Sequence, residues 1–276
     1  MKLIPFLLFS FLLIQSCQSQ SASSSEEETT AIAAKDTLEV SEVTIDSHLL
    51  TLLNDDYVRG LFNPAERDDF VKIERRHADR EGMYLRKEVY EAFQKMDEAA
   101  KADSINLQIR SATRNFQNQK RIWENKWTGK TLIENGENLS KTTPDARERA
   151  LKILRFSSMP STSRHHWGTD MDFNAFNNAY FEKGEGKKVY DWLIAHAAEY
   201  GFCQPYTAKD DQRPNGYNEE KWHWSYLPTA VPLTQYYKDN VSNERIEGFL
   251  GAEAAVEIDV VENYVLEINT ECLNEM

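Results

Sequence analysis

Two short segments of this chain carry side chains that bind metal ions, and they lie far apart in the sequence. Segments 163–172 and 219–224 together hold three of the six histidines, and both also hold acidic residues. Imidazole and carboxylate are natural ligands of Zn2+, and a catalytic zinc site takes three protein ligands and keeps one open position. A suitable set consists of His165, Asp172 and His223. If these residues share one ion, the fold must place the two segments side by side.

The second segment also contains a candidate general base. Glu220 lies three residues before His223, from where its carboxylate can reach a water on the metal. In a regular strand, residues three apart point to opposite faces. We therefore predict a turn or bulge just before Trp222, which returns Glu220 to the side of His223.

Two further residues lie beside the expected ligands of the first segment. The spacing favours Asp172 as the ligand, and we expect Asp170 to face away from the metal and to orient a histidine. Asp170 as the true ligand is the alternative. We predict that His166 supports the ligands or lines the cleft, with substrate contact as the alternative.

The hydrophobic pattern predicts helices and strands in an irregular order. Apolar residues recur at helical spacing in segment 84–102, and a short strand is predicted at 107–111. Alternating apolar residues in segment 256–268 predict a C-terminal β-hairpin. Further helices are predicted for 116–127, 146–156 and 189–200, and a strand for 222–226. Because the strands do not alternate regularly with helices, the pattern indicates an α+β fold rather than a doubly wound sheet.

Three motifs stand in the order typical of one enzyme family. Segment 163–172, SRHHWGTDMD, fits the pattern Ser-x-His-x-x-Gly-x-x-x-Asp, and segment 220–223, EKWH, fits Glu-x-Trp-His. Segment 111–114, SATR, with Gln119 after it, looks like Ser-x-x-Arg…Gln. These motifs resemble those of the zinc D-alanyl-D-alanine carboxypeptidases of the VanY type, and the similarity covers about residues 84–226.

The resemblance implies a fold and a metal site. The family's fold is a small antiparallel sheet flanked by helices, also called Hedgehog-like, in a single catalytic domain. The resemblance places zinc on His165, Asp172 and His223, and it makes Glu220 the base. No nucleotide or organic cofactor is implied.

The resemblance also implies an activity, namely hydrolysis of the terminal D-alanine of peptidoglycan stem peptides. Arg114 then binds a carboxylate or stabilises an oxyanion, and Gln119 and Ser163 are expected to bind substrate. An L,D-carboxypeptidase or a peptidoglycan endopeptidase on the same scaffold is one alternative. The other is a lipoprotein that binds metal or a wall peptide without cleaving it, although a pure binder has no use for Glu220 as a base.

The N-terminal segment predicts export. Lys2 precedes an apolar run at 3–14, which is typical of a signal peptide and shorter than the roughly 20 residues of a membrane-spanning helix. Segment 13–17, LIQSC, resembles the lipobox of bacterial lipoproteins, in which Cys17 becomes the lipidated first residue. Ordinary secretion with a free Cys17 is the alternative.

The sequence therefore predicts four parts. Residues 1–16 form a lipoprotein signal peptide, and residues 17–46, rich in serine and glutamate, form a flexible tether after the lipidated cysteine. The zinc carboxypeptidase domain is predicted at 47–245, and the hairpin at 246–276 is an extension packed on it. We expect the protein in the bacterial cell envelope, attached by lipid.

Two cysteines remain if Cys17 carries lipid. An oxidising compartment permits Cys203 and Cys272 to form a disulfide, and two buried free thiols are the alternative.

The charge balance limits the partners. A net charge of -13 makes the whole surface a poor match for nucleic acid or anionic lipid. We expect no nucleic-acid partner, membrane attachment through the lipid only, and a monomer.

Overall fold

The structure is a computed structural model that describes residues 53–273. The predicted signal peptide, Cys17 and the predicted tether lie outside the described residues. Within residues 53–273, the helices are too short or too polar to cross a bilayer.

A four-stranded antiparallel sheet forms the centre of the described chain, with the strand order β3-β4-β6-β5. The two inner strands, β4 (Asp170–Phe173) and β6 (His223–Tyr226), pair with each other. The edge strands are β3 (Ile109–Ser111) and β5 (Phe202–Cys203). The α+β class and the small antiparallel sheet predicted from the sequence are confirmed.

A second, two-stranded sheet precedes the longest helix. Strand β1 (Phe70–Lys72) pairs with β2 (Tyr84–Arg86), and α3 (Lys87–Ala102) follows directly. The helix predicted at 84–102 thus begins three residues later, because its first residues are used by β2.

The apolar face of the central sheet packs on two helices. In β4, Met171 and Phe173 point into a hydrophobic cluster that also contains Phe93 of α3 and Leu193 of α7 (Gly184–His196). The rings of Phe93 and Phe173 stack with their centroids 5.7 Å apart. The opposite face of β4 therefore remains for polar residues.

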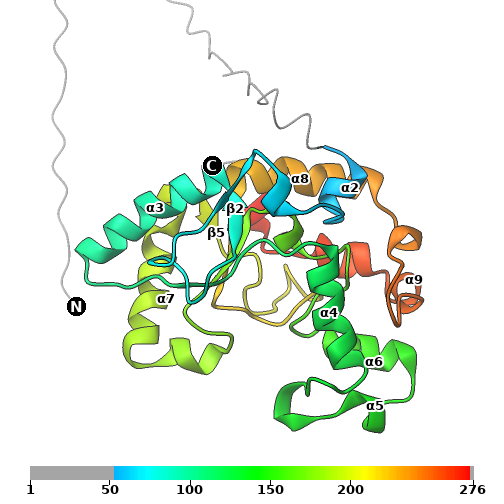
Figure 1. The fold of residues 1–276 in the computed structure, drawn as a ribbon. Coiled ribbons are helices and arrows are strands. Elements are labelled where there is room, and N and C mark those ends of the chain that lie inside the picture. Colours follow the sequence, from blue (N-terminus) through cyan, green and yellow to red (C-terminus); the bar gives the residue numbers. More distant parts are fainter. Residues whose placement is uncertain (1–52, 274–276) are drawn as a thin grey trace, which may run out of the picture. The chain divides into compact units, whose positions relative to one another are not determined.

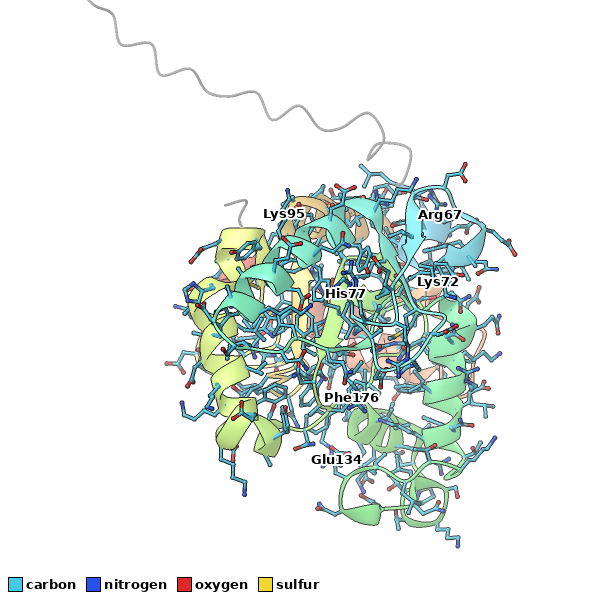
Figure 2. All side chains as sticks on the ribbon, turned by 60° about the vertical axis from the view of Figure 1, so that its left-hand side comes forward. Arg67, Lys72, His77, Lys95, Glu134 and Phe176 are labelled. Carbon is cyan, nitrogen blue, oxygen red and sulfur yellow. A yellow bond between two sulfur atoms is a disulfide. The ribbon has the colours of Figure 1, made fainter. Side chains whose placement is uncertain are left out.

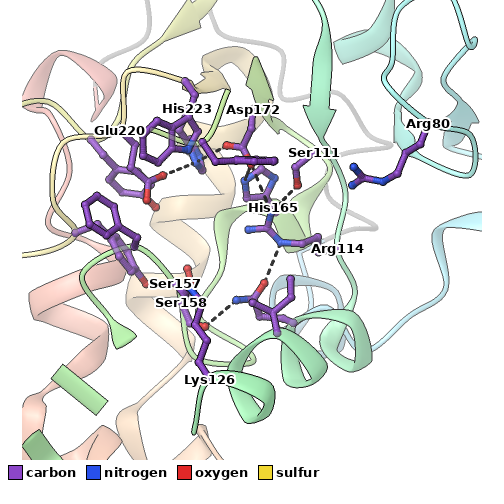
Figure 3. A pocket seen from close by; sticks show the side chains of 17 residues that line it. Arg80, Ser111, Arg114, Lys126, Ser157, Ser158, His165, Asp172, Glu220 and His223 are labelled. Carbon is purple, nitrogen blue, oxygen red and sulfur yellow. Dashed lines mark hydrogen bonds and ion pairs between the residues drawn. The ribbon is translucent and has the colours of Figure 1, made fainter. Parts of the chain in front are cut away.

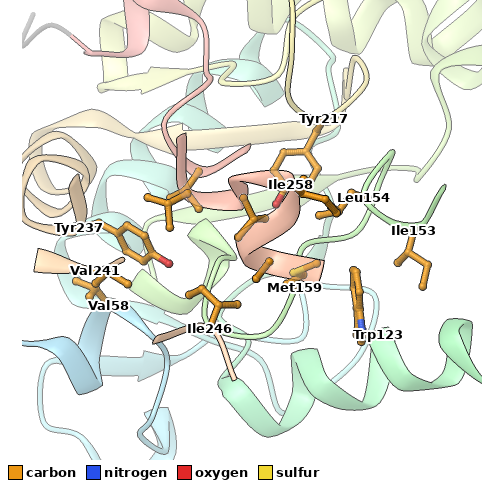
Figure 4. Close-up of a cluster of buried hydrophobic side chains, with 14 of the residues drawn as sticks. Val58, Trp123, Ile153, Leu154, Met159, Tyr217, Tyr237, Val241, Ile246 and Ile258 are labelled. Carbon is orange, nitrogen blue, oxygen red and sulfur yellow. The ribbon is translucent and has the colours of Figure 1, made fainter. Parts of the chain in front are cut away.

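A second hydrophobic cluster joins the remaining long helices. It includes buried residues of α4 (Phe116–Trp127), α6 (Ala146–Ile153) and α8 (Leu227–Asn240), and Figure 4 shows part of it. In Figure 1, α3 and α7 lie on one side of the central strands and α4 with α6 on the other. The shorter helices are α2 (Asp55–Val58), η1 (Pro64–Glu66), η2 (Glu134–Gly136), α5 (Leu139–Thr142), η4 (Asn178–Glu182), η5 (Ala197–Tyr200) and η6 (Asn243–Arg245).

The prediction of a C-terminal β-hairpin is wrong. The segment forms α9 (Ala254–Ile258), a π-helical turn η7 (Val261–Val265) and a short η8 (Thr270–Leu273). Its apolar residues alternate, but they also recur every three or four positions, which is the helical period. Burial follows the helical period, since Ile258 is buried whereas Val256 is 52% exposed.

A disulfide ties this C-terminal part to the central sheet. Cys203 in β5 and Cys272 in η8 are joined, with their Cα atoms 5.7 Å apart. The structure thus pairs the two cysteines that the sequence offers as a disulfide.

Candidate metal centre

The two inner strands bring the candidate ligands together. Asp172 of β4 lies opposite His223 of β6 in the strand register, and Asp170 lies opposite Ser225. Asp170 does not face away from the site, contrary to the prediction, because residues two apart on a strand share a face. Both carboxylates therefore point to the polar side of β4.

His165 reaches the same place from a short helical turn. The turn η3 (Arg164–Trp167) ends at Gly168, whose φ of 75° is in the left-handed region. A Cβ atom at Gly168 would lie only 2.5 Å from the ring of Phe70. Glycine thus permits the sharp passage from η3 into β4 that brings His165 beside Asp172.

The three candidate ligands form one buried group. Ligand atoms of His165, Asp172 and His223 all lie within 4.8 Å of one another. Nε2 of His165 is 3.3 Å from Oδ2 of Asp172, and Nδ1 of His223 is 3.2 Å from Oδ1 of Asp172. Figure 3 shows these side chains converging on one wall of a cavity.

Hydrogen bonds determine which imidazole nitrogen faces the group. Nδ1 of His165 lies 2.9 Å from the carbonyl oxygen of Ala112 and donates to it. Nε2 of His223 lies 2.8 Å from Oδ2 of Asp170. The remaining nitrogens, Nε2 of His165 and Nδ1 of His223, are those that face Asp172, as metal ligands would.

The group fits a divalent cation. Nε2 of His165 and Oδ1 of Asp172 are buried and have no hydrogen-bond partner among the described residues. Orphaned buried polar atoms are costly, and coordination to a metal would satisfy both. Burial lowers the pKa of His165 to about 4, which leaves its ring neutral, as a metal ligand must be. Two imidazoles and one carboxylate are a donor set suited to zinc.

The negative charge around His223 also favours a bound cation. Burial alone would lower the pKa of His223, but the carboxylates of Asp170, Asp172 and Glu220 hold it well above the ordinary value. Three carboxylates lie beside this ring, so without a metal the ring holds a proton, which a bound cation would replace.

Asp170 has the surroundings of a supporting carboxylate. It accepts hydrogen bonds from Arg164, Thr169 and Ser225 at 3.2, 2.6 and 2.8 Å, in addition to the contact with His223. Although burial raises the pKa of Asp170, Arg164 and His223 hold it well below the ordinary value. Because its oxygens are already engaged, Asp170 orients His223 and is not placed as a ligand.

Glu220 lies beside the group in a turn. Strand β6 begins only at His223, and the N–H of His223 donates to the carbonyl oxygen of Glu220 at 3.2 Å. Oε2 of Glu220 is 3.3 Å from Nδ1 of His223, so the predicted turn does return Glu220 to this side. Burial raises the pKa of Glu220, which brings this carboxylate closer to the pKa expected of a base at neutral pH.

Arg114 completes the polar wall. Its guanidinium donates to Gln119 at 2.9 Å and to Ser111 at 2.5 Å, and Nη1 is 3.5 Å from Oδ2 of Asp172. The amide of Gln119 in turn donates to the carbonyl oxygen of Ser158 at 2.8 Å. Gln119 lines the cavity, and its hydrogen bonds position Arg114.

His166 and Ser163 lie behind this wall. Nδ1 of His166 lies 2.5 Å from the carbonyl oxygen of Arg114, and its Nε2 accepts from the N–H of Ser161. Burial lowers the pKa of His166 to about 3, so the neutral ring holds the main chain of Arg114. Neither His166 nor Ser163 lines the cavity, and the buried hydroxyl of Ser163 has no hydrogen-bond partner within residues 53–273.

The cavity beside the group has a volume of about 340 Å3. Several of its wall residues come from α4 and from irregular segments. No motif in the sequence identified these residues as part of a site. Tyr206, for example, packs edge-on against His223 with the ring centroids 4.7 Å apart. The wall residues that the sequence analysis missed include Lys126, Phe156, Ser157, Ser158, Tyr206 and Tyr217.

Fold and site together define a class of protein. The turn η3 and two strands of a small antiparallel sheet bring two histidines and an aspartate next to a buried glutamate, which is a donor set able to hold a metal ion beside a candidate base. The sequence model of VanY, D-alanyl-D-alanine carboxypeptidase, matches residues 82–229. The chain belongs to the VanY D-alanyl-D-alanine carboxypeptidase family.

Two curated proteins are similar to this chain. YodJ of Bacillus subtilis (strain 168), provisionally named a carboxypeptidase, is 27% identical over 190 residues. The match covers 65% of this chain and 60% of YodJ, so the chain spans less than two thirds of that protein. An uncharacterized protein of Haemophilus influenzae is 25% identical over 112 residues, which are 35% of this chain and 82% of that protein.

Solved structures are also similar to this chain. VanYB in complex with D-alanine-D-alanine is 22% identical with a TM-score of 0.46, and the match covers 64% of this chain and 87% of VanYB. The LdcB LD-carboxypeptidase is 24% identical with a TM-score of 0.45, and the match covers 63% of this chain and 78% of LdcB.

Proposed function

We propose that this protein is a zinc-dependent carboxypeptidase that removes the terminal D-alanine from peptidoglycan stem peptides. The observation that carries the proposal is the buried group of His165, Asp172 and His223, which shares one cavity with Glu220 and Arg114. Two of its ligand atoms, on His165 and Asp172, have no hydrogen-bond partner among the described residues. Membership of the VanY family supports the same activity.

The side chains around the cavity have complementary tasks in hydrolysis. When bound to His165, Asp172 and His223, zinc supplies a Lewis acid that polarises a carbonyl group and lowers the pKa of water. The carboxylate of Glu220, whose pKa is raised by burial, accepts a proton from the attacking water and passes it to the nitrogen of the leaving D-alanine.

Arg114 stabilises negative charge on the substrate. Ser111 and Gln119 each accept one hydrogen bond from its guanidinium group. These two bonds fix the orientation of the planar group in the cavity wall. A planar guanidinium can donate further N–H groups to a carboxylate or to the oxyanion of the transition state. A carboxypeptidase needs such a group, because its substrate ends in a free carboxylate.

The related alternatives differ in the bond they cleave. Purified protein with its metal content measured should release one D-alanine from a stem pentapeptide that ends in D-alanyl-D-alanine. Release of D-alanine from the tetrapeptide instead would identify an L,D-carboxypeptidase, and cleavage of cross-linked stems only would identify an endopeptidase. Zinc binding without cleavage of these substrates would favour a binding protein.

The proposal includes a place of action. The apolar run at 3–14 and the cysteine at position 17 support export and lipidation, so the catalytic domain would act in the bacterial cell envelope. Peptidoglycan is in the same compartment, which makes the proposed location and the proposed substrate consistent.

A further inference from the structure

One wall residue of the candidate active-site cavity is a cation for which the described part of the chain offers no ion-pair partner. Lys126 lies in the last turn of α4, and its Nζ donates to the hydroxyl of Ser157 at 2.6 Å. Within residues 53–273, no carboxylate forms an ion pair with Lys126. Other described lysines also have no ion pair, for example Lys130, but Lys126 is the lysine that lines this cavity.

The environment of Lys126 disfavours its own charge. Burial lowers the pKa of its ammonium group below the ordinary value, while the more distant charges of Glu134 and Glu220 only partly oppose this effect. Lys126 is half-buried, and an ammonium group that has given up part of its water without gaining a counter-charge is well suited to bind an anion. The favourable interaction would come from a carboxylate that arrives with the ligand.

Lys126 lies at the junction of two cavities. It lines the cavity of the metal group and also a neighbouring cavity of about 350 Å3. Both cavities share the side chains of Phe156, Phe176 and Trp222, so they adjoin. Figure 3 shows Lys126 at the end of the first cavity away from His223.

The neighbouring cavity opens beside apolar surface. Phe176 and Leu132, which line it, are 49% and 50% exposed, and large apolar side chains so exposed often mark a binding surface. Figure 2 shows Phe176 and Glu134, both from this second cavity, at the same part of the molecule. A peptide that leaves the first cavity past Lys126 would therefore enter a space of suitable character.

We propose that Lys126 selects peptides that carry a carboxylate side group on the acyl side of the scissile bond, with the preceding residues lying in the second cavity. This inference rests on the proposed function. When the terminal residue lies between Arg114 and the metal group, the rest of the peptide must extend away from the scissile bond, and the second cavity adjoins the first at Lys126. Lys126 would thus be a specificity-determining residue rather than a catalytic one.

Two positions of a stem peptide can supply such a carboxylate. Test peptides can carry lysine or diaminopimelate as the third residue, which differ in one side-chain carboxylate, and glutamate or its amide as the second residue. The experiment measures kcat/KM for D-alanine release from two matched pairs of peptides, each pair differing at one of these positions. The position with the larger ratio identifies the carboxylate that contacts Lys126.

The variants isolate the charge of Lys126. We expect the parent to prefer the acidic member of one pair by about tenfold, the order expected of a charge-assisted hydrogen bond. In K126M, which keeps the aliphatic stem, this ratio should fall toward one, and K126R should retain part of it. K130M is the matched control, because Lys130 is exposed and lines neither cavity, and its ratio should equal that of the parent.

Two results would overturn the inference while leaving the proposed function intact. One is a parent whose kcat/KM is nearly equal for the two members of both peptide pairs. The other is a K126M variant that prefers the acidic peptide as strongly as the parent does, while its thermal unfolding shows that it is folded. If no peptide is cleaved, the proposed function fails, and calorimetric binding of the same peptides then decides about Lys126. Tighter binding of an acidic peptide that K126M abolishes would support the inference, and equal binding of all peptides would overturn it.

Discussion

Replacement of Glu220 should lower activity without lowering metal content, whereas replacement of a metal ligand should lower both. E220Q preserves size and hydrogen bonding but removes the basicity of the carboxylate. We expect its zinc content to stay near that of the parent while kcat falls by about two to four orders of magnitude, the usual contribution of general acid-base catalysis. Metal analysis and D-alanine release, measured on the same preparation, test this expectation.

The matched comparison is His223, which belongs to the metal group itself. H223A removes one of three candidate ligands, so metal and activity should be lost together. A variant E220Q that works at the parental rate would refute the assignment of the base. A variant H223A that keeps full zinc content would refute the assignment of the ligands.

His77 provides a separate prediction about stability and pH. Its buried ring lies 2.6 Å from the hydroxyl of Tyr90 and 3.4 Å from Asp97. Burial lowers the pKa of His77, despite the opposing charge of Asp97. The unfolded chain therefore takes up this proton at higher pH than the folded chain, and the stabilisation is complete above about pH 6.5 and is lost as the pH falls.

Chemical unfolding of the parent and of H77Q at several pH values tests this behaviour. Between the folded and unfolded pKa values, the free energy of unfolding of the parent should fall by up to about 1.4 kcal/mol per pH unit more than that of H77Q. Equal pH dependence in the two proteins would show that His77 does not contribute.

At the level of secondary structure, segments whose apolar residues repeat at one clear spacing could be predicted, and so could segments with metal-binding side chains. The helix expected at 116–127 is α4 (Phe116–Trp127), and the strand at 222–226 contains β6 (His223–Tyr226). The ligand group could be predicted because the chain has only six histidines, and three of them lie in the two short segments that also carry acidic residues. The turn at Glu220 could be predicted because a regular strand would have separated it from His223.

Other features left no unambiguous signal in the sequence. The apolar residues of α9 (Ala254–Ile258) fit both the helical and the strand period, and only tertiary packing decides between them. Lys126 and Tyr206 reach the cavity from a helix end and an irregular segment, whose directions depend on the rest of the fold. By contrast, the shared face of Asp170 and Asp172 does follow from the sequence, because residues two apart on a strand point to the same side.

The disulfide joins two secondary-structure elements and should contribute measurably to the free energy of unfolding. It links β5, an edge strand of the central sheet, to η8 near the end of the described chain, across a separation of 69 residues. We expect C272S to lower the free energy of unfolding by about 2–5 kcal/mol, because the unfolded chain regains the entropy that the closed loop removes. Chemical unfolding of the two proteins measures the difference.

Reduction of the parent supplies the control for this variant. Reduced parent and C272S should unfold at similar denaturant concentrations, both below that of the oxidised parent. Mass spectrometry of unreduced peptides should show Cys203 linked to Cys272. If both thiols can be alkylated without prior reduction, the C-terminal helices are held by packing alone.

The whole molecule offers a test of anchoring. The apolar run at 3–14 would be removed with the signal peptide, so the mature chain would depend on the lipid at Cys17 for membrane attachment. We expect C17S to move the protein from the membrane fraction into the soluble fraction, as followed by immunoblotting. Equal fractionation of parent and variant as soluble protein would contradict the lipoprotein hypothesis.

The positions of the three candidate ligands in the chain also determine when a metal ion can bind during folding. His165 and Asp172 are close in the chain, but His223 arrives only with β6, the last strand of the central sheet to be synthesised. A chain whose β6 has not yet paired with β4 offers an incomplete chelate, so it would compete poorly for scarce metal. Metal binding would thus follow the pairing of β4 with β6, and the bound ion would stabilise this pairing, because it binds the chain only when the pairing is present.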